Sequence, residues 1–298
     1  MPLAKDSASF LSRYNLHLDA LETAQLDWTE LEAVYADHEA SIGDLDNCAR
    51  YIVDSLRTLP EVHSIRYRVK NPEHLVAKII RKKLDHPERD YSLAGYRSTV
   101  TDLLGIRALH LFKDDWLPIH TLISGKWEQA DEMPTANIRR GDDDSHFKEH
   151  GCKVHEHEAG YRSVHYLIRS NPAKQTVIAE LQVRTLFEEA WCEIDHLVRY
   201  PHVSDHPMLA GYLGVFNRMA GGADEMGLFV RQLKQHLEDA SAERNKVEAE
   251  LTRKLEELDD AISKLKVADK EKELLKKRVG ELSAKQFSAP LASFPIQS

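Results

Sequence analysis

The residues best placed to do chemistry in this chain are two acids, each next to or within a short apolar run. Glu180 lies in AELQVRT, where polar and apolar residues alternate as they do in a β-strand. Side chains two apart share a strand face, so Glu180, Gln182 and Arg184 point the same way. Asp102 enters a second apolar run, LLGIRALHLF, which is typical of a buried strand and carries Arg107.

These two acids predict a site for metal-assisted phosphoryl transfer. Mg²⁺ prefers carboxylates together with substrate phosphates as its ligands, and two acids on neighbouring strands can hold it beside the reacting groups. Taken alone, Asp102 is more simply explained as a helix cap or a surface acid. The prediction therefore depends on what surrounds the pair.

Basic residues gather on the segment before these runs. In VHSIRYRVK, three cations alternate with apolar residues and share a strand face, and a helix with further cations follows. Fixed cations on one surface suit a polyphosphate, because they neutralise its charge. By itself such a cluster is more often a solvated basic face. The set comprises Arg66, Arg68, Lys70, Lys78, Arg81, Lys82 and Lys83.

The stretch GYRSVH adds residues that could recognise a nucleotide base. Gly160 allows a ligand to approach the backbone closely, and Tyr161 offers a ring on which a base can stack. Arg162 and His165 could reach phosphates or a base edge. The more ordinary role of a tyrosine at a strand entry is packing.

A sheet with helices around it must position these residues. Residues 7–59 carry apolar side chains at helical spacing. After the basic strand, Asn71 is a good helix cap, Pro72 suits the first helical position, and Glu73 favours the positive end of the helix dipole. A second helix is expected at DDWLPIHTLI, with an aspartate as its cap.

The second half of the sheet is expected near the acidic strand. The polar segment 131–158, rich in His and Asp, predicts a loop or an irregular hairpin. YRSVHYLIRS and TVIAELQVRT predict two strands that are joined by a turn at Asn171–Pro172. A long helix then reaches Tyr200 and ends before Pro201. Helices flanking a mixed β-sheet make an α/β or α+β domain.

Composition narrows the class of protein. With 42% apolar residues the 298-residue chain can build a core, and its net charge of -9 argues against a surface that binds nucleic acid throughout. The three scattered cysteines Cys48, Cys152 and Cys192 favour a reducing compartment over a disulfide framework. The start lacks the apolar core of a signal peptide, and no apolar run could cross a bilayer. We expect a cytoplasmic protein without a membrane partner.

Four motifs in this order resemble one known family. The motifs are similar to those of the synthetase domain of the RelA/SpoT family, the enzymes that make the alarmone (p)ppGpp of the stringent response. They are RVK with a later Lys, DLLGIR, GYRSVH, and ELQVRT followed by W.EI.H and Tyr200. The resemblance covers about 66–200. No region resembles the family's hydrolase domain, so the chain is identified as a small alarmone synthetase with a nucleotidyltransferase-like synthetase domain only.

The resemblance implies a reaction and roles for the residues. Pyrophosphate would pass from ATP to the 3′-hydroxyl of GDP or GTP, with Mg²⁺ held by Asp102 and Glu180, and Glu180 could also accept the proton of the hydroxyl. The implied ATP ligands are Arg66, Arg68, Lys70, Lys78 and Arg107. The implied acceptor side comprises Tyr161, Arg162, His165, Gln182 and Arg184.

Departures from the family leave alternatives open. His74 stands where many members have Ser, and the loop CKVHEHEAG has Glu156, Glu158 and Ala159 where many have a Lys-rich segment and an Asn. Acids repel acceptor phosphates, so a toxin that pyrophosphorylates the 3′ end of tRNA, or a synthetase that makes an adenosine alarmone, is the main rival. The histidines at 146–157 fit no standard zinc spacing.

The chain changes character after about Gly222. Apolar residues recur at heptad spacing, with breaks of the kind that coiled coils tolerate. The helix either folds back on its own domain, or mediates self-association or partner binding. If the helix carries the function, the protein is a non-catalytic, nucleotide-binding scaffold, which is a third functional hypothesis. We divide the chain into a helical segment 1–60, a synthetase domain 61–222, an amphipathic helix or coiled coil 223–285 and a tail 286–298.

Overall fold

The computed structural model describes residues 6–171, 176–199, 207–265 and 268–286. The turn at Pro172, the end of the predicted helix at Tyr200 and most of the tail predicted for 286–298 lie outside these residues. Contacts divide the chain into two compact units, residues 1–228 and 229–298. No helix among the described residues is long and apolar enough to cross a membrane.

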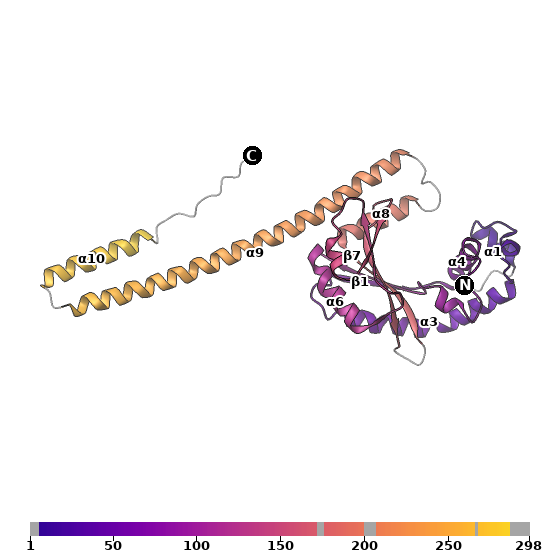
Figure 1. Ribbon diagram of the computed structural model, residues 1–298, viewed down its shortest axis with the longest axis horizontal. Coiled ribbons are helices and arrows are strands. Elements are labelled where there is room, and N and C mark those ends of the chain that lie inside the picture. The colour runs from indigo at the N-terminus through magenta and orange to yellow at the C-terminus, as the bar shows by residue number, and fades with distance from the viewer. Residues whose placement is uncertain (1–5, 172–175, 200–206, 266–267, 287–298) are drawn as a thin grey trace. The chain divides into compact units, whose positions relative to one another are not determined.

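The first unit holds a mixed β-sheet surrounded by helices, as the sequence predicts (Figure 1). The strands are β1 Ser64–Val69, β2 Leu104–His110, β3 Glu128–Gln129, β4 Thr135–Arg139, β5 Lys153–His157, β6 Ser163–Ser170 and β7 Val177–Thr185. Their order is β1-β2-β7-β6-β4-β5, and β3 pairs with β6. The pairs β2–β7 and β4–β5 are parallel, and the other pairs are antiparallel.

The helices differ greatly in length. Those before β2 are α1 Ser7–Arg13, α2 Ala20–Thr23, α3 Trp28–Leu56, α4 Pro72–Asp85 and α5 Tyr96–Thr99. Those after it are the 3₁₀ turn η1 Lys113–Asp115, α6 Trp116–Lys126, α7 Ser145–Glu149, α8 Leu186–Arg199, α9 Pro207–Lys264 and α10 Asp269–Gln286. The long helix α3 confirms the helical character predicted for the N-terminal segment.

Alternation along the strands gives the sheet one apolar and one polar face. Ile106 of β2, Leu181 of β7 and Tyr166 of β6 are aligned across neighbouring strands and are almost fully buried. They pack on residues of α3 and α6, such as Ile52 and Ile119, to form the main core. Burying this face leaves the alternate residues of the same strands on the opposite face, which is the polar one.

A second core joins the N-terminal helices to α4. Leu31 and Val34 of α3 pack with Leu75 and Ile79 of α4, and all four are buried. Asn71 caps α4 as predicted, because its side chain accepts hydrogen bonds from the backbone N–H groups of residues 73 and 74. This packing fixes α4, and therefore its lysines, against the sheet.

One local prediction is wrong, and another holds only in part. Segment 131–158 is a β-α-β unit, with β4 and β5 parallel and α7 between them, because β4 gains a partner in β6 that lies far along the sequence. An aspartate, Asp115, stands at the N-cap of α6 as predicted, but its side chain accepts a hydrogen bond from the backbone N–H of Phe112 and makes no capping hydrogen bond to α6.

The C-terminal region is two helices. α9 begins at Pro207, well before Gly222, and its first residues belong to the first compact unit. In the second unit α10 returns along the end of α9, where Lys276 lies 3.4 Å from Asp259 and Ile262 is buried. The predicted coiled-coil association stays a prediction.

Replacing Tyr166 by Phe should destabilise the protein. The Tyr166 hydroxyl accepts a hydrogen bond from Trp116 Nε1 at 2.9 Å and lies 3.1 Å from His120 Nδ1, all within the core. Its loss leaves a buried donor unpaired, which costs about 1–3 kcal/mol. Urea unfolding measures the change. The control Tyr67→Phe removes an exposed hydroxyl bound to Asp46 and should cost less than about 0.5 kcal/mol; equal losses would contradict this role.

Buried histidines should make the protein less stable in mild acid. Burial lowers the pKa of His38, His110 and His120 below the ordinary value. These histidines therefore become protonated near pH 6.5 in the unfolded chain but stay neutral there in the folded chain. The free energy of unfolding consequently decreases as the pH falls below about 6.5. We expect His110→Asn to reduce the loss of Tm between pH 7.5 and pH 5, and exposed His63→Asn to leave it unchanged. An unaltered loss in His110→Asn would contradict this.

Candidate functional site

The polar face of the sheet brings most of the predicted residues into two adjacent rows. Cross-strand partners point to the same face. One row runs Arg66, Arg107, Gln182, His165, and the next runs Arg68, Gly105, Glu180. Gly105 has no side chain, and the Arg68 side chain lies over its backbone: Nε and Cγ of Arg68 would be 3.6 and 3.7 Å from a Cβ at Gly105. The glycine thus provides the space that the Arg68 side chain occupies in this row.

Asp102 lies just before β2 and holds two lysines. Its Oδ2 is 2.6 Å from Lys70 Nζ and 2.8 Å from Lys78 Nζ. Burial acts to raise the pKa of Asp102, but the hydrogen bonds and charges of both lysines outweigh it and lower that pKa. Asp102 therefore stays ionised. The other oxygen, Oδ1, is buried and makes no hydrogen bond in the part of the chain that the structure describes.

Glu180 is linked to Tyr161 through a histidine. His165 Nδ1 lies 3.3 Å from Glu180 Oε1, and His165 Nε2 lies 2.7 Å from the Tyr161 hydroxyl. A carboxylate only accepts, so Nδ1 carries the ring proton, and Nε2 accepts from the tyrosine. Burial raises the pKa of Glu180, but His165 and Gln182 outweigh it and lower that pKa. The charge of Asp102 acts to raise it, so the two acids lie within electrostatic range of each other.

Arg184 supports the aromatic ring. Its guanidinium lies over the Tyr161 ring, 5.3 Å from the ring centre, and Nη2 donates to Gln182 Oε1. Arg184 is 1% exposed, and Glu189 of α8 supplies the opposite charge at 3.3 Å. A buried cation needs such a partner. One face of Tyr161 is thus covered by protein.

Arg107, predicted to bind ATP, is held by acids of α8. Its Nη1 lies 2.9 Å from Glu189 Oε1 and also contacts Glu193 Oε1. Hydrogen bonding to Arg107 lowers the pKa of Glu193. α8 therefore covers part of the polar face, opposite the face that packs on α3 (Figure 1). A phosphate that bound Arg107 would compete with these carboxylates.

The structure does not bring Arg162 to the other predicted residues. It alternates with Tyr161 and points the other way, where its Nε lies 3.7 Å from Glu188. Both terminal nitrogens are buried without hydrogen-bond partners among the described residues. Near them, burial and the charge of Glu188 raise the pKa of Asp224, on α9, to about 7. Arg162 is therefore placed to hold α9 rather than an acceptor phosphate.

The residues present fit a divalent cation at the paired acids. Asp102 Oδ1 is a buried carboxylate oxygen with no hydrogen-bond donor among the described residues, and Glu180 is an ionised acid on the adjacent strand. The residues described here include no cluster of three or more His, Cys, Asp or Glu side chains, so substrate phosphates would complete the ligand set. His146 and His150 instead pack their rings against Trp116.

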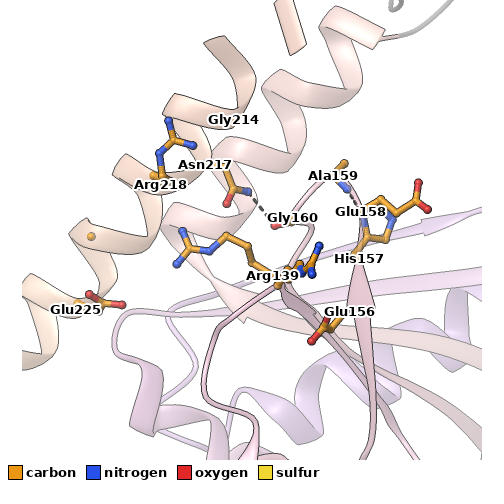
Figure 2. A pocket seen from close by; sticks show the side chains of 12 residues that line it. Arg139, Glu156, His157, Glu158, Ala159, Gly160, Gly214, Asn217, Arg218 and Glu225 are labelled. Carbon is orange, nitrogen blue, oxygen red and sulfur yellow. Dashed lines mark hydrogen bonds between the residues drawn. The ribbon is translucent and has the colours of Figure 1, made fainter. Parts of the chain in front are cut away.

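A cavity of about 930 Å³ lies beside the segment that leads into Tyr161 rather than over the two acids (Figure 2). Residues 156–160, from the end of β5 into the turn that follows it, and α9 form its walls, and its charged side chains include Arg139, Arg140, Arg218, Glu156 and Glu158. His157 joins it to the polar face, since its ring centre lies 5.4 Å from that of Tyr161. The acids and cations on the polar face of the sheet therefore indicate the candidate site better than the volume of this cavity does.

The sequence interpretation missed Glu189 and Asn217. Glu189 and Glu193 are four residues apart on the helix after β7, and this spacing puts two acids on one helix face. That signal could have identified counter-charges for strand arginines. Asn217 lies on α9 and donates from Nδ2 to the Gly160 carbonyl at 2.8 Å. No local pattern distinguishes this residue.

Comparison with known proteins identifies the region that holds the site. Residues 67–205 match the family model described as the region found in RelA / SpoT proteins. No curated protein matches the chain. Small alarmone synthetase 1 from Bacillus subtilis is similar over 67% of this chain and 94% of its own, with 20% identity and a TM-score of 0.45. A GTP pyrophosphokinase family protein from Streptococcus pneumoniae is similar over 69% and 93%, with 21% identity and a TM-score of 0.45.

Proposed function

We propose, from the match of residues 67–205 to the family model of the RelA/SpoT region, that the chain is a nucleotide pyrophosphokinase that makes (p)ppGpp. The 3′-hydroxyl oxygen of GDP or GTP would attack the β-phosphorus of ATP, AMP would leave, and Glu180 would take the hydroxyl proton. The observation that carries the proposal is the placement of the two acids beside fixed cations: Asp102 lies just before β2, and Glu180 of the neighbouring strand β7 pairs with Gly105, three residues further on.

Each residue of the site supports a distinct part of this reaction. Lys70 and Lys78 are oriented by Asp102 and would bind donor phosphates. Glu180, kept ionised by His165, is ready to accept a proton at neutral pH. Tyr161 would stack on the acceptor base with the ring surface that Arg184 leaves free. Mg²⁺ held by Asp102 and Glu180 would neutralise charge that develops on the phosphates.

An RNA 3′ end, which carries no free triphosphate, is a second candidate acceptor. Glu156 and Glu158 are exposed and line the cavity beside the Tyr161 loop. These acids oppose a free triphosphate there, whereas Arg139, Arg140 and Arg218 in the same walls suit a phosphodiester backbone. The acceptor is therefore the part of the reaction that the assay must resolve.

Purified protein with Mg-ATP and labelled acceptors should pyrophosphorylate GDP or GTP. GDP, GTP, ADP, ATP and tRNA are offered in parallel, and product is separated chromatographically. Glu180→Gln should lower the rate by roughly a hundredfold or more, because the base is lost. Glu88→Gln, which alters an exposed acid, is the matched control. Product on tRNA or an adenine nucleotide alone would replace the guanine acceptor, and no product with any acceptor would overturn the proposal.

Releasing Arg107 should improve ATP binding. In Glu193→Gln the carboxylate that contacts Arg107 becomes a neutral amide, so donor phosphates compete with one acid fewer. We expect the KM for ATP to fall several-fold, with a smaller effect on the acceptor KM. Asp195→Asn removes the same charge from the same helix and should leave the KM for ATP nearly unchanged. An unchanged or higher KM in Glu193→Gln would contradict a role of Arg107 in ATP binding.

A further inference from the structure

The first part of α9 has a buried face although it follows the matched region. Leu213, Asn217, Ala220 and Asp224 recur at helical spacing and are each at most 7% exposed. Gly221 lies so close to Arg162 that a Cβ there would be 2.7 Å from Nη1. Trp191 of α8 donates from Nε1 to the Leu213 carbonyl at 3.1 Å. This part of α9 is therefore seated firmly in the first compact unit.

Asn217 reaches from this face to the loop that carries Tyr161 (Figure 2). Its Nδ2 donates to the Gly160 carbonyl at 2.8 Å. Gly160 has φ +74, in the left-handed region, and a Cβ at Gly160 would come within 3.1 Å of the Asn217 amide. The glycine thus permits both the backbone turn and the close approach of α9.

Stability alone does not explain an asparagine at position 217. The side chain is 3% exposed, and its Oδ1 makes no hydrogen bond among the described residues. Burying an amide with one polar atom unpaired costs free energy that an apolar side chain would not. The amide is useful at this place because it fixes the Gly160 carbonyl, one residue before Tyr161.

We propose that Asn217 is a positioning residue for the acceptor, and that α9 is therefore part of the catalytic unit. This inference rests on the proposed function. The peptide bond that Asn217 holds leads directly into Tyr161, whose hydroxyl joins His165 and Glu180. Loss of the hydrogen bond would let the ring and the attached histidine shift relative to Glu180. Lys70, Lys78 and Asp102 lie on other segments, so ATP binding is independent of it.

Steady-state kinetics separate this role from a general structural one. Asn217→Asp keeps the shape of the side chain but replaces the donor by a carboxylate oxygen, and Asn217→Ala removes it. With GDP as acceptor, we expect both variants to raise the KM for GDP by about tenfold, the factor for one lost hydrogen bond, with the KM for ATP unchanged. Met219→Ala, on the same helix but 66% exposed, should match the unmodified protein. Equal rises in both KM values would overturn the proposal.

Hydrogen exchange tests the same contact without catalysis. Backbone amides of residues 157–165 should exchange faster in Asn217→Asp than in Met219→Ala, while those of β2 keep their protection. If the unmodified protein uses no guanine nucleotide, the proposed function is wrong. Faster exchange of residues 157–165 in Asn217→Asp would still show that Asn217 holds this segment in place. Unchanged exchange at residues 157–165 overturns the positioning role whatever the acceptor proves to be.

Discussion

The ion pairs of Asp102 are the interaction on which the site depends. One carboxylate oxygen holds Lys70 and Lys78, and the other is buried without a hydrogen bond among the described residues. Buried charges are tolerated only when they are paired, so both lysines are fixed in direction before a substrate arrives. The site therefore combines preset cations with an acid oxygen that still lacks a partner. A metal ion and donor phosphates would satisfy both needs.

The same rule organises the polar face around Tyr161. Arg107 and Arg184 are cations of the sheet's polar face, and Glu189 of α8 neutralises both. Arg184 in turn covers Tyr161, whose hydroxyl leads through His165 to Glu180. Burying one face of the sheet in the core thus forces polar side chains to the other face, where they can be stable only as a connected network. Such a network keeps Glu180, the Tyr161 ring and α8 in fixed relation.

Much of the sheet could be predicted because its central strands alternate strictly. β2, β6 and β7 have buried residues at every second position over most of their length, and Asn71 signals the start of α4. The rows of the site follow from that alternation once the strand order is known. β4 and β5 were missed because their pairing, β4 with the distant strand β6 and β5 with β4, makes them strands rather than their own polar composition. Arg162 was assigned to the acceptor because local spacing does not show that α9 returns to bury it. Asn217 was missed for the same reason, since long-range packing alone gives it a role.

Manganese binding measured by electron paramagnetic resonance tests the paired acids most directly. Mn²⁺ would be titrated into the protein in the presence of a non-hydrolysable ATP analogue, with Asp102→Asn and Glu180→Gln alongside. We expect saturable binding at a site that either substitution weakens by at least tenfold, because both carboxylates are ligands of one ion. Equal Mn²⁺ affinity in all three proteins would show that Asp102 and Glu180 do not share a metal, and would contradict the proposed arrangement of the site.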